Sequence, residues 1–186
     1  SGTLTKSGIA VIPGTTLLST GESLVWTPTL NANGTLVAFT VKAFDGAVDS
    51  ATAVQVNISV AAVNDPPTNI TLSASSIPEN QTAGTAIGSF STTDPDVGDT
   101  FTYTLVSGTG STDNASFTIV GNQLRSAVAF DFETKSSYSI RARTTDAGGL
   151  SFEKVFSISI TNANDPPTLT TISTLTGATE DTAYSI

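Results

Sequence analysis

The sequence predicts an all-β fold built from antiparallel sandwich modules in tandem. Three observations support this prediction. Thr, Val, Ile and Phe are abundant, and 15 Gly and 8 Pro residues interrupt them, which is typical of short strands joined by tight turns. Apolar and polar residues alternate along several segments, and no segment shows a convincing helical period. The motif Asn-Asp-Pro-Pro-Thr occurs at 64–68 and again at 164–168, so the chain repeats with a period of 100 residues.

The repeat divides the chain at two proline pairs. Pro-Pro donates no ladder hydrogen bonds and holds φ at about −65°, so each pair forms a short, stiff linker. We expect the chain to be a segment of a longer protein, because it begins and ends inside modules. Its parts are the C-terminal part of a module (1–62), a linker (63–67), a complete module (68–163), a second linker (164–167) and the start of a third module (168–186).

The complete module is expected to contain seven strands. They are predicted at 69–75, 85–92, 101–105, 115–120, 122–128, 138–144 and 156–160. Gly121-Asn122 and Ala147-Gly148-Gly149 indicate hairpin turns. Short strands at this spacing are typical of two antiparallel sheets packed face to face, as in immunoglobulin-like domains. The chain has no Cys, so the aliphatic and Phe core must hold the sheets together without disulfides.

The outer parts lack strands that the complete module has. Residues 1–62 predict a hairpin at 4–11, a strand at 39–43 and a last strand at 54–60. Because the first three strands of a sandwich are missing, we expect open sheet edges and uncovered apolar faces there. Residues 168–186 contain the missing type of segment, a first strand at 169–175 followed by Glu180.

The composition excludes several kinds of chemistry. Without His or Cys, the chain cannot form Ser-His-Asp or Cys-His catalytic sites, ordinary zinc sites, or haem and iron–sulfur ligation. A formal net charge of −9 argues against nucleic-acid binding, which depends on clustered Lys and Arg. Asp131 and Glu133 are too close in sequence, and too near a linker, to be interpreted as a glycosidase pair. We therefore expect no enzyme activity.

The acidic residues occur in a fixed order at the expected strand ends. Loops of a sandwich gather at its two ends, so alternate strand ends should bring these residues into two groups. The group near the second linker contains Glu79, Asp131, Glu133, Asn164 and Asp165. The group near the first linker contains Asn64, Asp65, Asp94, Asp96, Asp99 and Asp146.

Each acidic group requires a counter-charge, because like charges close together repel. An abundant supply of hard oxygen ligands without His or Cys favours Ca²⁺ over transition metals. The sequence thus predicts calcium at both ends of the complete module. Asp45 and Glu180 are secondary candidate ligands in the partial modules, whereas Asp49 and Asp113 lack a motif and are interpreted as turn residues.

These motifs, taken in order, resemble the calcium motifs of cadherin repeats. The resemblance covers 64–168 and is carried by Pro78-Glu79-Asn80, Asp94-Pro95-Asp96, Asp131-Phe132-Glu133, Asp146-Ala147-Gly148 and Asn164-Asp165-Pro166. The Ser- and Thr-rich setting with Asn-Asp-Pro-Pro linkers is similar to bacterial cadherin-like repeats of large secreted surface adhesins, including RTX-type ones. The resemblance implies an extracellular location and calcium bound between consecutive modules, which stiffens the array.

Residues 1–62 depart from this pattern. They have Asn31 and Asn33 where the complete module has Asp131 and Glu133, and they lack a first-strand Glu. The resemblance therefore implies one well-formed calcium site at 64–67, with upstream ligands in short supply. The acidic loop is also shorter than in animal cadherins, so Asp99 is expected to take a role that an Asn carbonyl has in those proteins.

The main functional hypothesis is a calcium-stiffened spacer of an extracellular adhesin, whose partners are neighbouring repeats of the same protein. A second hypothesis is a matrix filament in which partial modules of different chains complete each other head to tail by strand donation. Completion of both modules within one longer chain is the competing interpretation. A third hypothesis, a sugar-binding accessory domain of a secreted enzyme, requires several exposed aromatics, and 1 Trp with 3 Tyr are few.

Overall fold

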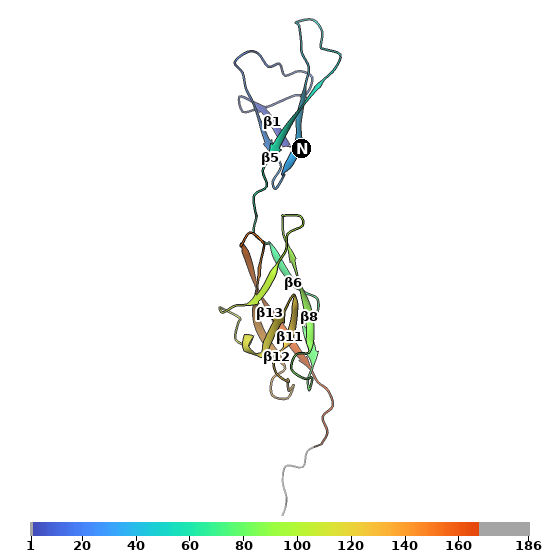
Figure 1. The fold of residues 1–186 in the computed structure, drawn as a ribbon, viewed down its shortest axis with the longest axis vertical. Helices are drawn as coiled ribbons and strands as arrows, with labels where there is room; N and C mark the ends of the chain where they lie inside the picture. The colour runs from blue at the N-terminus through green and yellow to red at the C-terminus, as the bar shows by residue number, and fades with distance from the viewer. Residues whose placement is uncertain (1, 168–186) are drawn as a thin grey trace, which may run out of the picture.

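The computed structural model describes residues 2–167, and its strands form two groups that lie end to end in an elongated molecule (Figure 1). We call residues 2–60 the upstream unit and residues 69–161 the central unit. The all-β prediction is confirmed, since the helical structure among the described residues is a single 3₁₀ turn, Asn114–Ser116. Within residues 2–167 no helix has the length and apolar character needed to cross a membrane.

The central unit is a sandwich of two four-stranded sheets. Strands β7 and β13 pair in parallel, and all other neighbours are antiparallel. One sheet has the order β10 (Phe117–Val120), β11 (Gln123–Ser126), β8 (Ala86–Thr93) and β6 (Asn69–Leu72). The other has the order β7 (Ser76–Pro78), β13 (Ser151–Thr161), β12 (Ser137–Thr145) and β9 (Thr102–Leu105).

The first strand of the central unit changes sheets, which corrects the prediction of one strand at 69–75. The N–H of Ser73 still donates to the carbonyl of Ser89 on β8 at 3.0 Å. Two residues later, the carbonyl of Ser75 accepts from the N–H of Ser159 on β13 at 2.9 Å. Apolar alternation did not reveal the change, because an edge strand has the same period whichever sheet it pairs with.

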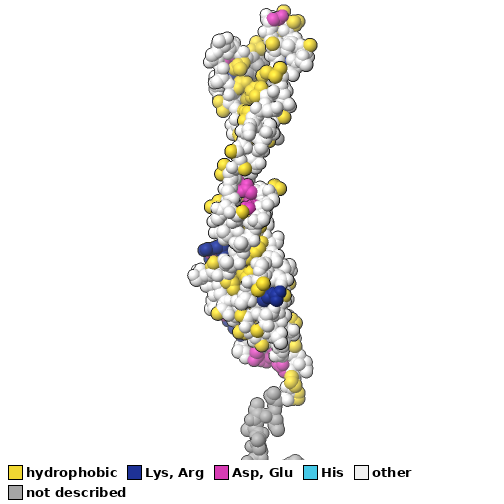
Figure 2. Space-filling model, in the orientation of Figure 1, with side chains coloured by type: hydrophobic (Ala, Val, Ile, Leu, Met, Phe, Trp, Pro, Cys, Tyr) yellow, Lys and Arg dark blue, Asp and Glu magenta, His cyan; other side chains and the backbone are white. Residues whose placement is uncertain are grey.

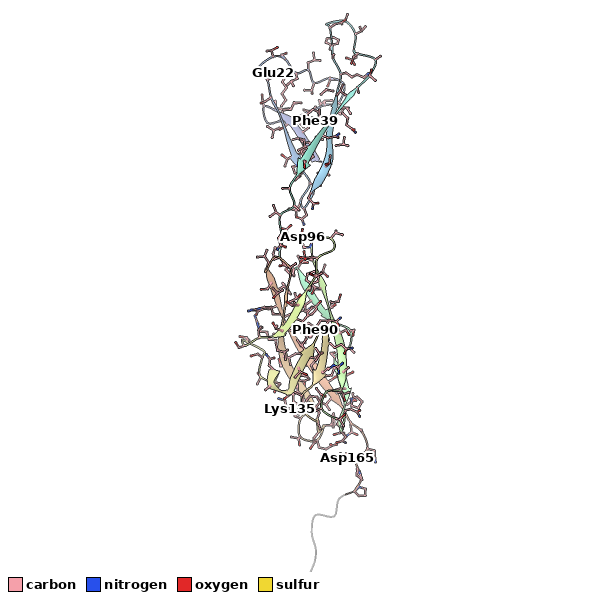
Figure 3. The ribbon with its side chains drawn as sticks, viewed as in Figure 1. Glu22, Phe39, Phe90, Asp96, Lys135 and Asp165 are labelled. Atoms are coloured by element: carbon pink, nitrogen blue, oxygen red, sulfur yellow. The ribbon has the colours of Figure 1, made fainter. Side chains whose placement is uncertain are left out.

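The core of the central unit lies between its two sheets. Ile70, Leu124 and Ile140 are fully buried, and they come from both sheets. Phe90, which Figure 3 labels at the middle of this unit, stacks on Tyr103 with a centroid distance of 5.5 Å. This packing fixes where each strand ends, and so it fixes which loops meet at each end of the sandwich.

Tight turns form where the sequence predicted them. Val120 pairs with Gln123 across Gly121-Asn122, and Gly121 has φ of 62°, in the left-handed region that glycine adopts without steric cost. Thr145 pairs with Ser151 across the loop 146–150. In the upstream unit, a hairpin turns at 7–8 as predicted.

The upstream unit has strands but no enclosed core. None of the residues 2–62 is buried, and Leu30 and Ile9 are 92% and 74% exposed. Figure 2 shows apolar side chains over the surface of this unit. The expected uncovered apolar faces are therefore present. The strands are β2 (Ile9–Ala10), β1 (Gly2–Lys6) and β3 (Leu24–Pro28) in one sheet and β4 (Gly34–Val41) with β5 (Val54–Val60) in another.

Candidate metal centres

Two groups of carboxylates lie at opposite ends of the central unit. Figure 3 labels Asp96 at the end next to the first linker and Asp165 at the other end, and acidic side chains gather at both in Figure 2. We call these ends the upstream pole and the downstream pole. In each group, one oxygen from every member lies within 4.8 Å of the others. The groups are Asp94, Asp99 and Asp146 at the upstream pole and Glu79, Glu133 and Asp165 at the downstream pole.

Carboxylate oxygens without partners mark the upstream pole. Asp94 Oδ2 and Asp99 Oδ2 are buried and have no hydrogen-bond partner among the described residues. Their Oδ1 atoms accept from the N–H groups of Asp96 and Thr100, each at 2.8 Å. Asp146 is 6% exposed. Burial of unpartnered negative oxygens is unfavourable, so this group is suited to a cation that supplies the missing interaction.

The first linker is attached to the upstream pole by two hydrogen bonds. Asn64 Nδ2 donates to Asp146 Oδ2 at 3.0 Å, and the N–H of Asp65 donates to Asp96 Oδ2 at 2.7 Å. Gly148 permits this close approach, because a Cβ at that position would lie 2.4 Å from the Asn64 carboxamide. A half-turn of the carboxamide would present Asn64 Oδ1, an oxygen ligand, at the same place.

At the downstream pole, Glu79 is 1% exposed and joins three segments. Its Oε2 accepts from the N–H of Phe132 at 2.7 Å, and its Oε1 accepts from the N–H of Ala163 at 2.8 Å. The first-strand glutamate therefore ties the end of β7 to the loop after β11 and to the chain that leaves β13. This structural role is present without any metal.

The negative charges at the downstream pole affect one another. A backbone hydrogen bond within Glu133 lowers its pKa, but desolvation and the charges of Glu79 and Asp165 outweigh that bond and raise the pKa overall. Glu133 is thus harder to ionise beside the other two carboxylates than it is alone. A bound cation would relieve this repulsion.

Asparagine amides also contact the downstream carboxylates. Asn80 Nδ2 donates to Asp165 Oδ1 at 2.6 Å, and Asn162 Nδ2 donates to Glu133 Oε1 at 2.8 Å. Asn164 Nδ2 donates to the backbone carbonyl of Asp165 at 3.3 Å. Asn80 and Asn162 were not among the predicted site residues. Asn80 follows Glu79 in the Pro-Glu-Asn motif, which was the signal available in the sequence.

Several predicted site residues do not join either convergent group. Asp131 accepts from the side-chain hydroxyl and the N–H of Thr134, at 2.8 and 2.9 Å, and these bonds lower its pKa. Asp45 lies in the loop after β4, at the end of the upstream unit away from the linker, where its Oδ1 accepts from two backbone N–H groups. Glu180 lies outside the described residues. Asp65 and Asp96 also lie outside the two groups, and their contact is the bond from the backbone N–H of Asp65 to the Asp96 carboxylate.

The interpretation of Asp113 as a plain turn residue is wrong. Its carboxylate accepts from Lys135 Nζ and, at 2.8 Å, from the N–H of Ser139 at the start of β12. Burial raises the pKa of Asp113, but these two bonds outweigh it and the net shift is downward. With a lowered folded-state pKa, the carboxylate stabilises the fold above the unfolded pKa of about 3.9, and this contribution is lost as the pH falls through the folded-state value.

We expect Asp113→Ala to lower the free energy of unfolding of the central unit by about 1–3 kcal/mol at pH 7, since it removes an ion pair with Lys135 and leaves the partly buried N–H of Ser139 without its acceptor. The loss should shrink as the pH falls below about 4. Urea denaturation at both pH values measures it. Asp49→Ala, at an exposed hairpin position, removes the same charge and is the control. Equal stability of the two variants at pH 7 would contradict the assignment.

The chain was compared with protein-family models and with solved structures. No family model matches the chain. The structure of PcdhgB3 EC1-4 aligns with 88% of this chain at 24% identity and a TM-score of 0.59, and this chain spans 41% of it. Human mucin-like protocadherin EC1-2 aligns with 88% of this chain at 18% identity and a TM-score of 0.55, and this chain spans 84% of it.

The matched structures also include longer chains. Protocadherin gamma B7 extracellular cadherin domains 1-4 is 26% identical over 61% of this chain, with a TM-score of 0.47, and this chain spans 28% of its length. The likenesses with TM-scores above 0.5 show that this chain has a cadherin-like fold.

Proposed function

We propose that the chain is a calcium-stiffened spacer segment of a large extracellular adhesin, of the bacterial RTX-related kind that its motifs resemble. The observation that carries the proposal is the pair of buried, unpartnered oxygens on Asp94 and Asp99 at the pole where the linker docks. A spacer of this kind performs mechanical work and needs no catalytic residue. The units at 2–60 and 69–161 act as consecutive modules of a tandem array.

The donor set at each pole fits calcium. All the converging side chains are carboxylates, and the carboxamides of Asn64, Asn80 and Asn162 lie beside them. Calcium takes six to eight oxygen ligands and tolerates irregular geometry, whereas Mg²⁺ requires a near-ideal octahedron. Asp94, Asp99 and Asp146 would hold the ion at the upstream pole, with Asn64 and Asp96 beside them, and Glu79, Glu133 and Asp165 would hold it at the downstream pole.

The chain prepares the junction before any ion binds. The bonds from Asn64 to Asp146 and from Asp65 to Asp96 hold the linker against the upstream pole. The adjacent Pro66-Pro67 limits backbone rotation. A bound cation would neutralise the negative charges of the upstream pole. The carboxylates of the pole and of the linker would then no longer repel each other. The proposed stiffness therefore comes from a restrained linker combined with a neutralised acidic loop.

The two sides of the first junction contribute unequally. The upstream unit presents Asn31 and Asn33 to a pocket shared with Asp96 and Asp99. Both are neutral, whereas the corresponding positions in the central unit are Asp131 and Glu133. Fewer charges favour fewer calcium ions at this junction than at one with carboxylates on both sides.

Small-angle X-ray scattering of the chain tests the proposed function. We expect calcium to narrow the distribution of distances between the units and to increase the maximum dimension, because a rigid linker keeps them end to end. Addition of chelator should reverse both changes. Identical scattering with calcium and with chelator would refute the spacer mechanism.

Asp99→Asn should weaken calcium binding at the upstream pole about tenfold or more, which is about 1.4 kcal/mol, because it removes a charged ligand while keeping the side-chain size. Isothermal titration calorimetry measures the affinity. Asp49→Asn makes the same change of charge at an exposed hairpin position. If both variants lose affinity equally, the overall charge of the chain and not this site determines binding.

A further inference from the structure

We infer that Asn33 is a site of spontaneous chemical modification, where hydrolysis of the side-chain amide places a carboxylate on the upstream side of the first junction. The conversion itself needs only water and does not depend on any ion. Its effect on calcium affinity rests on the proposed function. The upstream unit thereby acquires a charge that its sequence does not show.

Asn33 is the only asparagine of the chain that is followed by glycine. The chain contains ten Asn residues, and the residues that follow the other nine all have a Cβ atom. An Asn side chain loses its amide when the backbone nitrogen of the next residue attacks its Cγ, and a Cβ on that next residue hinders the approach. Glycine removes this hindrance. Asn33 is therefore the most reactive asparagine by sequence.

The reacting groups of Asn33 and Gly34 are accessible in the structure. Both residues are exposed, and Gly34 has φ of 83°. Apart from its chain neighbours, no heavy atom of the described residues lies within 4 Å of the position that a Cβ of Gly34 would take. The Asn33 carboxamide has one partner among the described residues, since its Nδ2 donates to the carbonyl of Asn31 at 3.5 Å, beyond the usual range of a hydrogen bond. No strong hydrogen bond therefore holds this amide away from the backbone.

Gly34 also lies at the end of a strand ladder, where the backbone opens most easily. It is the first residue of β4 and pairs with Val60, the last residue of β5. Pairs at the end of a ladder open at a small cost in free energy, whereas pairs in the middle stay closed. The nitrogen of Gly34 can therefore turn toward Cγ of Asn33 while the rest of the upstream unit stays folded.

The reaction is an intramolecular substitution followed by hydrolysis. The backbone nitrogen of Gly34 forms a bond to Cγ of Asn33, the Cγ–Nδ2 bond breaks, and Nδ2 takes the displaced proton and leaves as ammonia. Water then opens the resulting succinimide ring at either of its two C–N bonds, which gives aspartate or isoaspartate. Both products carry a free carboxylate. Because the reacting groups belong to adjacent residues, their effective concentration is high and no catalyst is required.

The central unit shows how this position behaves in a module with an enclosed core. Glu133 corresponds to Asn33 and is also exposed, so access of water to the position does not depend on an incomplete core. The Glu133 carboxylate converges with those of Glu79 and Asp165 at the downstream pole. A carboxylate at position 33 would have the corresponding place at the first junction.

The new carboxylate would face the acidic residues of the upstream pole. Asn33 lines one pocket together with Asp65 and Asp96, and a second pocket together with Asp96 and Asp99. Figure 3 shows Asp96 at the end of the central unit that faces the upstream unit. Without calcium, the added charge increases the repulsion across the junction. With calcium, it supplies one more charged oxygen ligand, and a larger number of charged ligands strengthens calcium binding.

Incubation of the full chain in chelator at mildly alkaline pH tests the conversion. Trypsin releases residues 7–42 as one peptide, and fragmentation in the mass spectrometer distinguishes Asn33 from Asn31 within it. We expect Asn33 to be converted at least about tenfold faster than any other Asn, because the next residue has no Cβ and lies at the end of a ladder. Asn33→Gln keeps a neutral amide, but it requires a larger ring and should stay unconverted. Equal rates at Asn33 and Asn31 would overturn the inference.

Calorimetric titration with calcium tests the effect of the new charge. Asn33→Asp has one of the two products in every molecule, and we expect it to bind calcium about threefold or more tightly than the unaltered chain. Asn57→Asp adds the same charge at an exposed position of β5 that lines neither pocket, and it is the control. Equal affinities of the two variants would overturn the inferred role of position 33 at the junction. A freshly prepared chain that binds no calcium would instead contradict the proposed function, and the conversion rates would still decide whether Asn33 is the modification site.

Discussion

Calcium at a hundredfold excess over Kd is expected to raise the free energy of unfolding of the central unit by about 2.7 kcal/mol for each bound ion, because the ion binds the folded arrangement of carboxylates and not the unfolded chain. For a unit of this size, such a change raises Tm by about 10 °C or more. Thermal unfolding followed by far-UV circular dichroism, with calcium and with chelator, measures the effect.

Two controls make this expectation specific to the poles. Magnesium at the same ionic strength should stabilise less, because the clustered carboxylates do not impose an octahedral site. The double variant Asp94→Asn with Asp99→Asn should lose the upstream part of the gain, because it removes the two charges that carry unpartnered oxygens. Coincident unfolding curves of the unaltered chain in calcium and in chelator would rule out the proposed metal centres.

Glu79→Ala is expected to destabilise the central unit by about 3 kcal/mol even in chelator. The buried carboxylate accepts from the N–H groups of Phe132 and Ala163, and hydrogen bonds to charged groups contribute about 1.5–3 kcal/mol each. Its removal also leaves two backbone donors without an acceptor at the point where β7, the loop after β11 and the end of β13 meet. Urea denaturation in chelator measures the loss.

Glu133→Ala is the control for Glu79→Ala. It removes the same charge from the same pole, but Glu133 is exposed and its carboxylate oxygen bonds the side chain of Asn162. Two probes distinguish the unfolding of the two units. Trp26, the only Trp, lies on β3, so its fluorescence reports unfolding of the upstream unit, whereas circular dichroism reports unfolding of both units. Equal destabilisation by the two variants in chelator would mean that Glu79 acts only through its charge.

Comparing variants of Glu79 and Glu133 distinguishes the stability that does not depend on calcium from the stability that calcium adds at the downstream pole. Both carboxylate oxygens of Glu79 accept hydrogen bonds from backbone N–H groups, so part of its contribution to folding stability does not depend on any ion. The neighbouring carboxylates raise the pKa of Glu133, and a bound cation would offset the repulsion that raises it. In chelator, replacing Glu79 should therefore lower the free energy of unfolding more than replacing Glu133. The increase in this free energy that calcium produces should be smaller in both variants.

Much of the fold follows from local features of the sequence. Alternation marks β12 and β13, Gly121-Asn122 marks the β10–β11 hairpin, and the repeated Asn-Asp-Pro-Pro marks the linkers. The separation of the acids into two poles also follows, because loops at alternate strand ends must meet at opposite ends of a sandwich. The prediction that residues 1–62 hold too few strands to enclose a core agrees with the exposed apolar side chains of the upstream unit.

Only the tertiary structure decided which side chains meet. It placed β6 and β7 in different sheets, paired Asp113 with Lys135, turned Asp131 toward Thr134 and brought Asn80 and Asn162 to the downstream carboxylates. The physical reason is the separation along the chain between the residues that interact. Strand period and turn chemistry depend on neighbours in sequence, and they are readable there. A hydrogen bond or a shared cation site depends on positions within an ångström between residues up to 85 apart, such as Asn80 and Asp165, and the packing of the whole sandwich sets those positions.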